Sequence, residues 1–285
     1  MRHVFFRLIL PCLSILWALH LSSSGWGFSA DQKMKPEEVV ARHLEALGTP
    51  EARAAVKTRI MNGEAWVDFL QGDTGQLAGK AQFVSDAERT RLEMRFGYND
   101  YEAEQLIFDG KKYLVGNVRP AVRSTLGIFV NDYVSSLLKE GILGGVTNVG
   151  WALGSGRKLN LSYRGLKELH GKTAHILRYQ SKRGDLRVDL GFDPETFRHV
   201  ITDYYLEIPA GGVDRPEESI NQRDSYWRAY EEFDDFRQVD GITLPHTYKL
   251  RVQFDGRITH LTEWRAKFSE VQQNQELSQD VFKLR

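Results

Sequence analysis

The chain has 285 residues, of which 41% are hydrophobic and 27% are charged. Its 38 Lys and Arg residues balance 38 Asp and Glu residues, and this balance excludes the strongly basic surface that is typical of nucleic-acid-binding proteins. The single cysteine, Cys12, lies in an N-terminal apolar stretch, so a chain processed after that stretch folds without disulfides.

The N-terminus has the order of residues found in a secretory signal peptide. Arg2 and Arg7 precede an apolar stretch over 8–21, and mostly small residues follow over 22–30. The stretch is short for a membrane-spanning helix, which needs about 20 residues, and an uncleaved anchor is the alternative. We therefore predict a signal peptide over 1–30, export from the cytoplasm, and a single domain over 31–285.

A helix is predicted to begin the mature chain. Pro36 and two glutamates suit a helix N-terminus, apolar residues recur at helical spacing from Val39 to Leu47, and Gly48 follows as a helix stop. The apolar stripe of this helix needs a surface to cover.

Strands are predicted next. The composition of 56–69 is that of a long strand with a bend or bulge at Gly63, and 81–84 is predicted as a short strand. In the following strand, Leu92, Met94 and Phe96 alternate with charged residues. A hairpin is predicted around the Asp109-Gly110 turn, with its strands over 105–108 and 112–115.

The segment 120–156, called here the middle segment, lacks strand alternation. Its first half has apolar residues at helical spacing, including Leu126, Phe129 and Tyr133, and its second half, with Trp151, is apolar and rich in glycine. This pattern predicts either two helices or one helix and a flexible apolar loop. Because the segment is apolar and separates two groups of strands, we expect it to act as a lid on one face of a sheet.

From 159 onward the chain is predicted to be a ladder of antiparallel strands. Apolar and polar residues alternate in several runs, and turn-forming pairs such as His170-Gly171, Asp193-Pro194 and Asp240-Gly241 separate them. The stretch 209–223 between two strands has the composition of a loop. The whole pattern favours an α+β protein built on one curved antiparallel sheet. The inward-facing residues are predicted to be Leu92, Met94, Phe96, Leu190, Phe192, Leu250, Val252 and Trp264.

Taken in order, the chain resembles the LolA/LolB-like superfamily of lipoprotein-binding proteins, especially the group called outer-membrane lipoprotein-sorting protein. The resemblance is carried by the opening helix, by the Asp-Gly-Lys turn at 109–111 between apolar and aromatic strands, and by the closing stretch from Phe233 to His246 with Trp264 and Phe282 after it. It covers most of the mature chain as an order of elements, and no single motif in it is diagnostic.

The resemblance implies an incomplete, open β-barrel whose concave face is covered by helices and encloses an apolar cavity for acyl chains. It also implies a periplasmic location. The chain lacks a lipidated cysteine at the position expected of a membrane-anchored receptor, and its middle segment is longer and richer in glycine than that of the simplest carriers. A functional arginine of the family matches Arg59, Arg89 and Arg91 equally well, so none of the three is assigned.

No residue pattern in the sequence indicates catalysis or metal binding. The histidines have none of the spacings typical of metal sites and are expected to have isolated roles. The acidic residues Glu231, Glu232, Asp234 and Asp235 are expected to lie at a solvated strand edge, because a calcium site needs six or more converging oxygens.

The leading hypothesis is therefore a carrier, not an enzyme, that binds a lipid or an acylated lipoprotein in the predicted apolar cavity, with a lid formed by Leu126, Phe129, Tyr133 and Trp151. A membrane-bound donor or acceptor protein is an expected further partner, and no cofactor is expected. The alternative is a periplasmic sensor or scaffold of the same fold that binds a protein through an exposed strand edge or through 209–223. An inward polar constellation would instead indicate an enzyme.

Overall fold

A computed structural model describes residues 34–155, 158–181, 184–210 and 224–284. The predicted signal peptide and most of the predicted 209–223 loop lie outside these residues. Twelve strands form one sheet in which every neighbouring pair is antiparallel. The strands are β1 (Thr58–Gln71), β2 (Gly75–Asp86), β3 (Thr90–Tyr98), β4 (Tyr101–Phe108), β5 (Tyr113–Val115), β6 (Leu161–Leu169), β7 (Lys172–Gln180), β8 (Leu186–Phe192), β9 (His199–Ile208), β10 (Ser225–Val239), β11 (Ile242–Asp255) and β12 (Thr259–Gln273).

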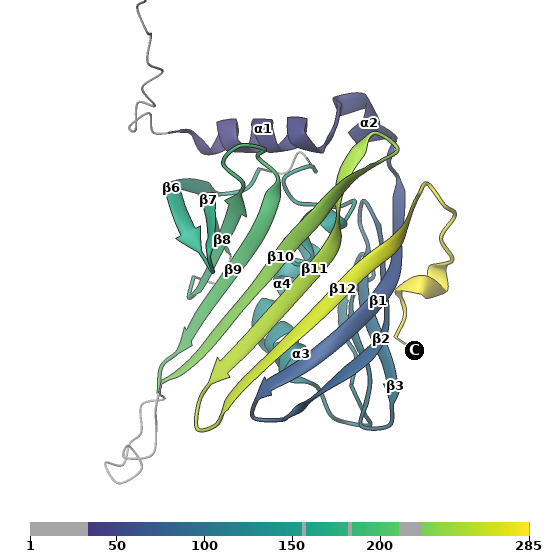
Figure 1. The fold of residues 1–285 in the computed structure, drawn as a ribbon, viewed down its shortest axis with the longest axis vertical. Helices are drawn as coiled ribbons and strands as arrows, with labels where there is room; N and C mark the ends of the chain where they lie inside the picture. Colours follow the sequence, from purple (N-terminus) through teal and green to yellow (C-terminus); the bar gives the residue numbers. More distant parts are fainter. Residues whose placement is uncertain (1–33, 156–157, 182–183, 211–223, 285) are drawn as a thin grey trace, which may run out of the picture. The chain divides into compact units, whose positions relative to one another are not determined.

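The strand order is β5-β4-β3-β2-β1-β12-β11-β10-β9-β8-β7-β6. The first strand therefore pairs with the last, and Figure 1 shows the blue β1 beside the yellow β12. The two edges, β5 and β6, are the strands that flank the middle segment, so the sheet is not closed. The segment that joins the edges passes along the concave face. This open, strongly curved antiparallel sheet is the fold class that the sequence predicts.

Local residue choices explain the bend in β1 and the tight turns. The pairing of β1 with β12 shifts between Asn62 and Gly63, and a Cβ at Gly63 would lie 2.0 Å from the carbonyl oxygen of Lys267. Only glycine therefore fits the predicted bulge. The pair Asp240-Gly241, with φ angles of 48° and 79°, makes the tight turn between β10 and β11.

The helical elements are short except for the first. They are α1 (Pro36–Leu47), α2 (Pro50–Ala55), α3 (Thr125–Phe129), the π-helical turn η1 (Val130–Val134), α4 (Ser135–Lys139), and the 3₁₀ turns η2 (Gly145–Thr147) and η3 (Gln279–Phe282). The predicted opening helix is confirmed as α1, which buries Val39, His43 and Leu47 and ends at Gly48. Within the described ranges, no helix is both long and apolar enough to span a bilayer.

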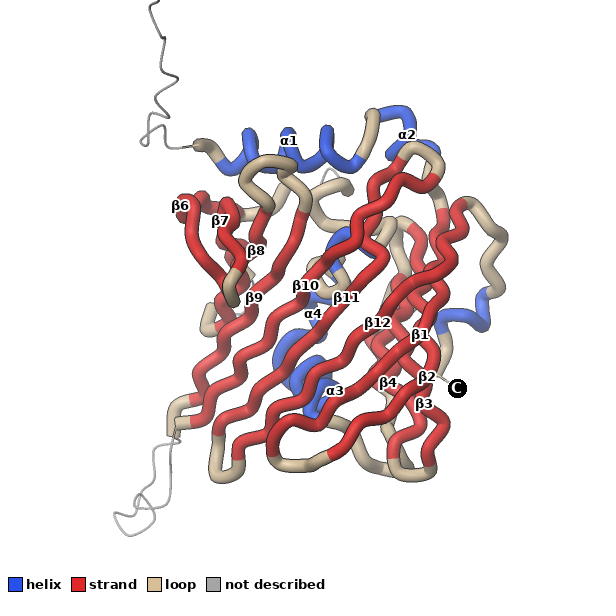
Figure 2. Tube along the Cα trace, in the orientation of Figure 1, coloured by secondary structure: helices blue, strands red, loops and turns tan. Residues whose placement is uncertain are grey.

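The core lies between the concave face of the sheet and the middle segment. Figure 2 shows α3 and α4 behind strands β10, β11 and β12, inside the curve of the sheet. Leu126, Phe129 and Leu137 of this segment are at most 1% exposed, and they belong to the same buried cluster as the inward side chains of the strands.

Two sequence expectations need correction. The strand predicted over 81–84 is the longer β2, because the polar residues before Ala81 still pair with β1. The glycine-rich half of the middle segment is packed rather than a flexible loop, since Ile142, Leu143 and Trp151 are at most 2% exposed. Its glycines permit close backbone contacts that an apolar loop with Cβ atoms could not make.

Candidate functional site

A cavity of about 870 Å³ opens at the end of the sheet where β1 turns into β2 and β11 turns into β12. This end is the lower one in Figure 1, beside α3. The volume falls within the range of roughly 300 to 1,000 Å³ that is common for small-molecule sites. Seven aromatic side chains supply much of the wall: Phe69, Tyr98, Tyr101, Tyr133, Trp227, Phe254 and Trp264.

The mouth of this cavity exposes apolar side chains to solvent. Ile128 on α3 is 39% exposed, Val122 is 37% exposed, and Tyr98 at the β3–β4 turn is 50% exposed. Charged groups also lie at the mouth, where Arg119 pairs with Asp100 at 3.1 Å. An apolar interior with a partly charged rim suits a ligand that has an apolar body and a polar end.

Polar atoms in the wall of the cavity are paired with one another. The indole N–H of Trp264 donates to the hydroxyl of Tyr101 at 3.1 Å, and that hydroxyl donates to the carboxylate of Glu104. Burial raises the pKa of Glu104. Because these groups satisfy each other, Trp264 and Tyr101 present their rings rather than free polar atoms to the cavity.

The predicted site residues fall into two groups. Trp264 and Tyr133 line the cavity, and their roles as a ligand-binding residue and a lid residue stay predictions. The other ten are buried in the main apolar cluster and do not line this aromatic cavity: Leu92, Met94, Phe96, Leu190, Phe192, Leu250, Val252, Leu126, Phe129 and Trp151. In this arrangement the middle segment fills most of the concave face. Contact between a ligand and these ten residues stays a prediction that requires the middle segment to move.

The sequence left three arginines as candidates for the functional arginine of the family. Of these three, Arg59 donates hydrogen bonds to the middle segment. Its Nη1 donates to the carbonyl oxygens of Val146 at 3.2 Å and Thr147 at 3.0 Å. By contrast, Arg89 pairs with Asp86 at 2.7 Å and Arg91 pairs with Glu93. Arg59 therefore ties β1 to the glycine-rich half of the middle segment.

Glu231 on β10 forms a second buried hydrogen-bond connection between the sheet and the middle segment. Its carboxylate accepts hydrogen bonds from the backbone N–H of Gly144 at 2.7 Å and from the hydroxyls of Tyr204 at 2.5 Å and Tyr248 at 2.7 Å. Burial raises its pKa to about 7. The expectation of a solvated edge is wrong for Glu231, which is 0% exposed, because β10 alternates and its odd-numbered residues from Trp227 to Phe233 are buried.

His43 forms a third buried hydrogen-bond connection, between α1 and the middle segment. Its Nε2 accepts the indole N–H of Trp151 at 3.0 Å, and its Nδ1 donates to the carbonyl oxygen of Phe197 at 3.0 Å. Burial lowers its pKa to about 4, so the ring is neutral. The expectation of isolated histidines is wrong here, because His199 stacks on Trp151 and its ring centroid lies 6.3 Å from that of His43.

Sequence reasoning missed these inward polar groups for a physical reason. Alternation places Glu231 on the same side as Ala229 and Phe233, but the acidic composition of 231–235 is typical of a solvated strand edge. The partner of its carboxylate, Gly144, is 87 residues away in the sequence. In the part of the chain that is described, no three His, Cys, Asp or Glu residues gather as a metal site would require.

Comparison with known proteins gives structural neighbours only. No protein-family model matches the chain, and no curated protein matches it. A LolA superfamily protein from Nitrosomonas europaea is similar over 88% of this chain and 98% of its own, with 9% sequence identity and a TM-score of 0.45. MucB in complex with MucA(peri) is similar over 84% of this chain and 98% of its own, with 8% identity and a TM-score of 0.21.

The described residues form an open, curved antiparallel sheet with helices in its concave face, which is the architecture that the sequence resemblance implies.

Proposed function

We propose that this protein is a periplasmic carrier that binds the acyl chain of a lipid or lipoprotein in the aromatic cavity at the end of the sheet. The single observation that carries the proposal is the cavity of about 870 Å³ with seven aromatic side chains in its wall. Each methylene group moved from water into such a site contributes about 0.8 kcal/mol. The signal-peptide-like order of the first 30 residues supports export.

The middle segment would act as the lid of this carrier. In the closed arrangement it fills the concave face with Leu126 and Phe129, both at most 1% exposed. A longer acyl chain would enter from the cavity mouth and displace α3, which would expose the predicted inward residues of the strands. A membrane-bound donor or acceptor protein would then engage the open form. The carrier would need no catalytic group.

A binding titration with a dansyl-labelled fatty acid tests the proposal. Ile128→Asp places a charge at the mouth, where the native side chain is 39% exposed. We expect it to weaken binding at least about tenfold, which corresponds to about 1.4 kcal/mol. Leu166→Asp is the matched control, because Leu166 is an exposed leucine on β6, outside the cavity wall. Equal affinities for wild type and both variants would contradict an acyl site at this cavity.

The second candidate is a sensor or scaffold that binds a protein partner at the β6 edge. The observation in its favour is that β6 is an edge strand with Leu166 54% exposed. A register shift between Tyr163 and Leu166, with Gly165 at a φ of 88°, interrupts this edge and disfavours simple strand addition. A stoichiometric protein partner that is lost with Leu166→Asp and kept with Ile128→Asp would favour this candidate.

A further inference from the structure

A second, smaller cavity lies at the other end of the sheet, between α2, β1 and the glycine-rich half of the middle segment. Its volume is about 70 Å³, enough for a small ion, since one water molecule needs about 10 to 15 Å³ by the same measure. It shares no wall residue with the aromatic cavity. Among the described residues, the charged side chains in its wall are Arg53 and Arg59.

Arg59 is a buried cation. It is 5% exposed, and within the described residues it forms no ion pair. Its Nη1 is bound to two carbonyl oxygens, whereas its buried Nε has no hydrogen-bond partner. A guanidinium carries five N–H donors, and the Nε donor of Arg59 is left unused by the described residues.

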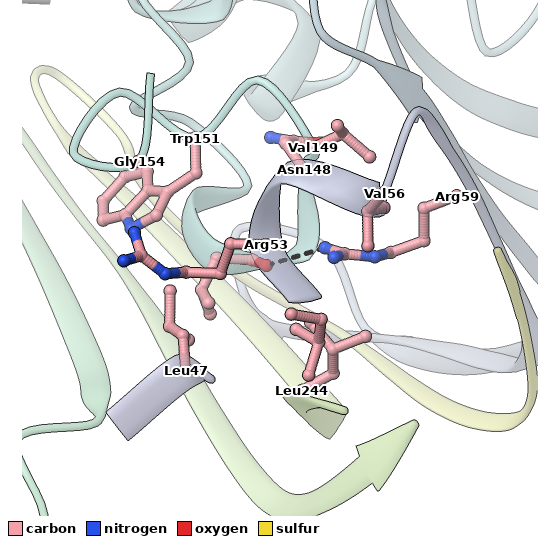
Figure 3. A pocket seen from close by; sticks show the side chains of 11 residues that line it. Leu47, Arg53, Val56, Arg59, Asn148, Val149, Trp151, Gly154 and Leu244 are labelled. Carbon is pink, nitrogen blue, oxygen red and sulfur yellow. Dashed lines mark hydrogen bonds between the residues drawn. The ribbon is translucent and has the colours of Figure 1, made fainter. Parts of the chain in front are cut away.

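Burying an unpaired charge is costly, and proteins ordinarily pair such a charge with an anion. Burial lowers the pKa of Arg59 to about 10, which still leaves the guanidinium charged at neutral pH. Arg53 adds a second positive charge to the lining of the cavity, and its Nε donates to the carbonyl oxygen of Gly48 at 3.2 Å. Figure 3 shows the Arg59 guanidinium on the Val56 side of the cavity and that of Arg53 on the side of Trp151 and Gly154.

We propose that this cavity binds a small oxyanion, of the size and charge of inorganic phosphate, on the guanidinium of Arg59, with Arg53 supplying positive potential from the opposite wall. Planar guanidinium groups match the oxygens of such anions. Because Arg59 also holds the carbonyl oxygens of Val146 and Thr147, a bound anion would neutralise the charge under the middle segment and stabilise its closed position.

Calorimetric titration of the full mature chain with inorganic phosphate, in chloride buffer at constant ionic strength, tests this site. We expect saturable binding at one site per chain and a rise in Tm. Arg59→Met should weaken binding more than about tenfold and Arg53→Gln about threefold, as expected for one direct and one remote charge. Arg42→Gln is the matched control, because Arg42 lies on the neighbouring α1 outside the cavity wall and should leave the affinity unchanged.

Several results would overturn the proposal. Absence of saturable phosphate binding by wild type would do so, as would wild-type affinity in both Arg59→Met and Arg53→Gln. If Arg59→Met fails to fold, Arg53→Gln alone decides. Dihexanoyl phosphatidic acid distinguishes a lipid headgroup from a free anion. Phosphatidic acid binding that depends on Arg59, without phosphate binding, would contradict a site for a free small anion. The test is independent of acyl binding at the aromatic cavity.

Discussion

Glu231 and His43 both hold the middle segment, and burial moves their pKa values in opposite directions. The carboxyl of Glu231 has a pKa of about 7 instead of 4.5, and the imidazole of His43 has a pKa of about 4 instead of 6.5. Between about pH 4.5 and 7, therefore, the carboxyl of Glu231 is protonated in the folded state but ionised in the unfolded state. Between pH 4 and 6.5 the unfolded state binds a proton on His43 that the folded state excludes.

For Glu231 the free energy of unfolding is predicted to fall as pH rises from about 4.5 through 7, because only the unfolded state ionises freely in that window. The full effect is about 3 kcal/mol. Glu231→Gln keeps the size of the side chain and removes the titration. Urea denaturation between pH 4.5 and 8 should therefore show the variant gaining stability relative to wild type as pH rises.

Glu270→Gln is the control for this series, because Glu270 is an exposed glutamate near the end of β12. A stability difference for Glu231→Gln that changes with pH no more than that for Glu270→Gln would contradict a raised pKa of the buried carboxyl.

For His43 the sign is reversed. Its folded-state pKa lies below its unfolded value, so its contribution is complete above pH 6.5 and is lost as pH falls toward 4, by about 3 kcal/mol. The positive charge of Arg53 further lowers the pKa of His43. His43→Gln should flatten the loss of stability below pH 6.5, as measured by urea denaturation, whereas a wild-type pH profile in this variant would contradict a neutral buried imidazole.

At the scale of single residues, the sequence predicts which face of the sheet a side chain occupies, but not its hydrogen-bond partners. Alternation correctly places Trp264 and Leu250 on the inward face, since that depends only on neighbours in the same strand. It could not predict that Trp264 donates to Tyr101, because that bond joins residues 163 positions apart. Local composition even misplaces Glu231, whose partners come from three separate elements.

The middle segment is the element in which glycine decides the structure. Gly141 has a φ of 68°, and a Cβ there would lie 2.2 Å from the carbonyl oxygen of Gly150. The segment thus folds back on itself through a close backbone contact rather than through side chains. This packing explains why a sequence so rich in glycine forms buried structure instead of a loose loop.

Gly141→Ala is predicted to destabilise the protein by about 2 kcal/mol more than Gly165→Ala, because it adds a steric clash to a strained φ. Gly165 is the matched control, since its φ of 88° is also positive but a Cβ there would meet nothing within 4 Å. Urea denaturation of both variants measures the difference. Equal losses in the free energy of unfolding for the two variants would contradict the prediction, because they would show that the backbone can move to accommodate a Cβ at position 141.

Among the elements, strands and turns were more predictable than helices. The hairpin around Gly110, the bulge at Gly63 and the turn at Asp240 follow from residue types that act locally. The helical part of the middle segment instead combines α3, a π-helical turn and α4 over 125–139. These turns share neighbours in the sheet, since α3 and α4 both contact β4, and η1 and α4 both contact β5.

At the scale of the whole molecule, the strand order links the two ends of the domain. Because β1 pairs with β12, the first and last strands form the centre of the sheet, and the middle segment joins its two edges. The two meanders can be predicted from their turns. The pairing of β1 with β12, which joins the two meanders, could not be predicted. These two strands lie at opposite ends of the domain sequence and carry no motif that marks them as partners.

The larger of the two cavities described above, the aromatic cavity, lies at one end of the sheet. The middle segment fills the concave face as far as Tyr133 and Trp227, and the aromatic cavity lies beyond them. The central claim is that this cavity holds an acyl chain in the cell. It requires the cavity to be occupied when the protein meets lipid.

Native mass spectrometry of the wild-type protein purified from the periplasm, followed by lipid extraction, tests this claim most directly. We predict a bound species whose mass and extract correspond to an acylated molecule, and its loss in the Ile128→Asp variant. Protein that is ligand-free in repeated preparations, with and without added lipid, would contradict the carrier function.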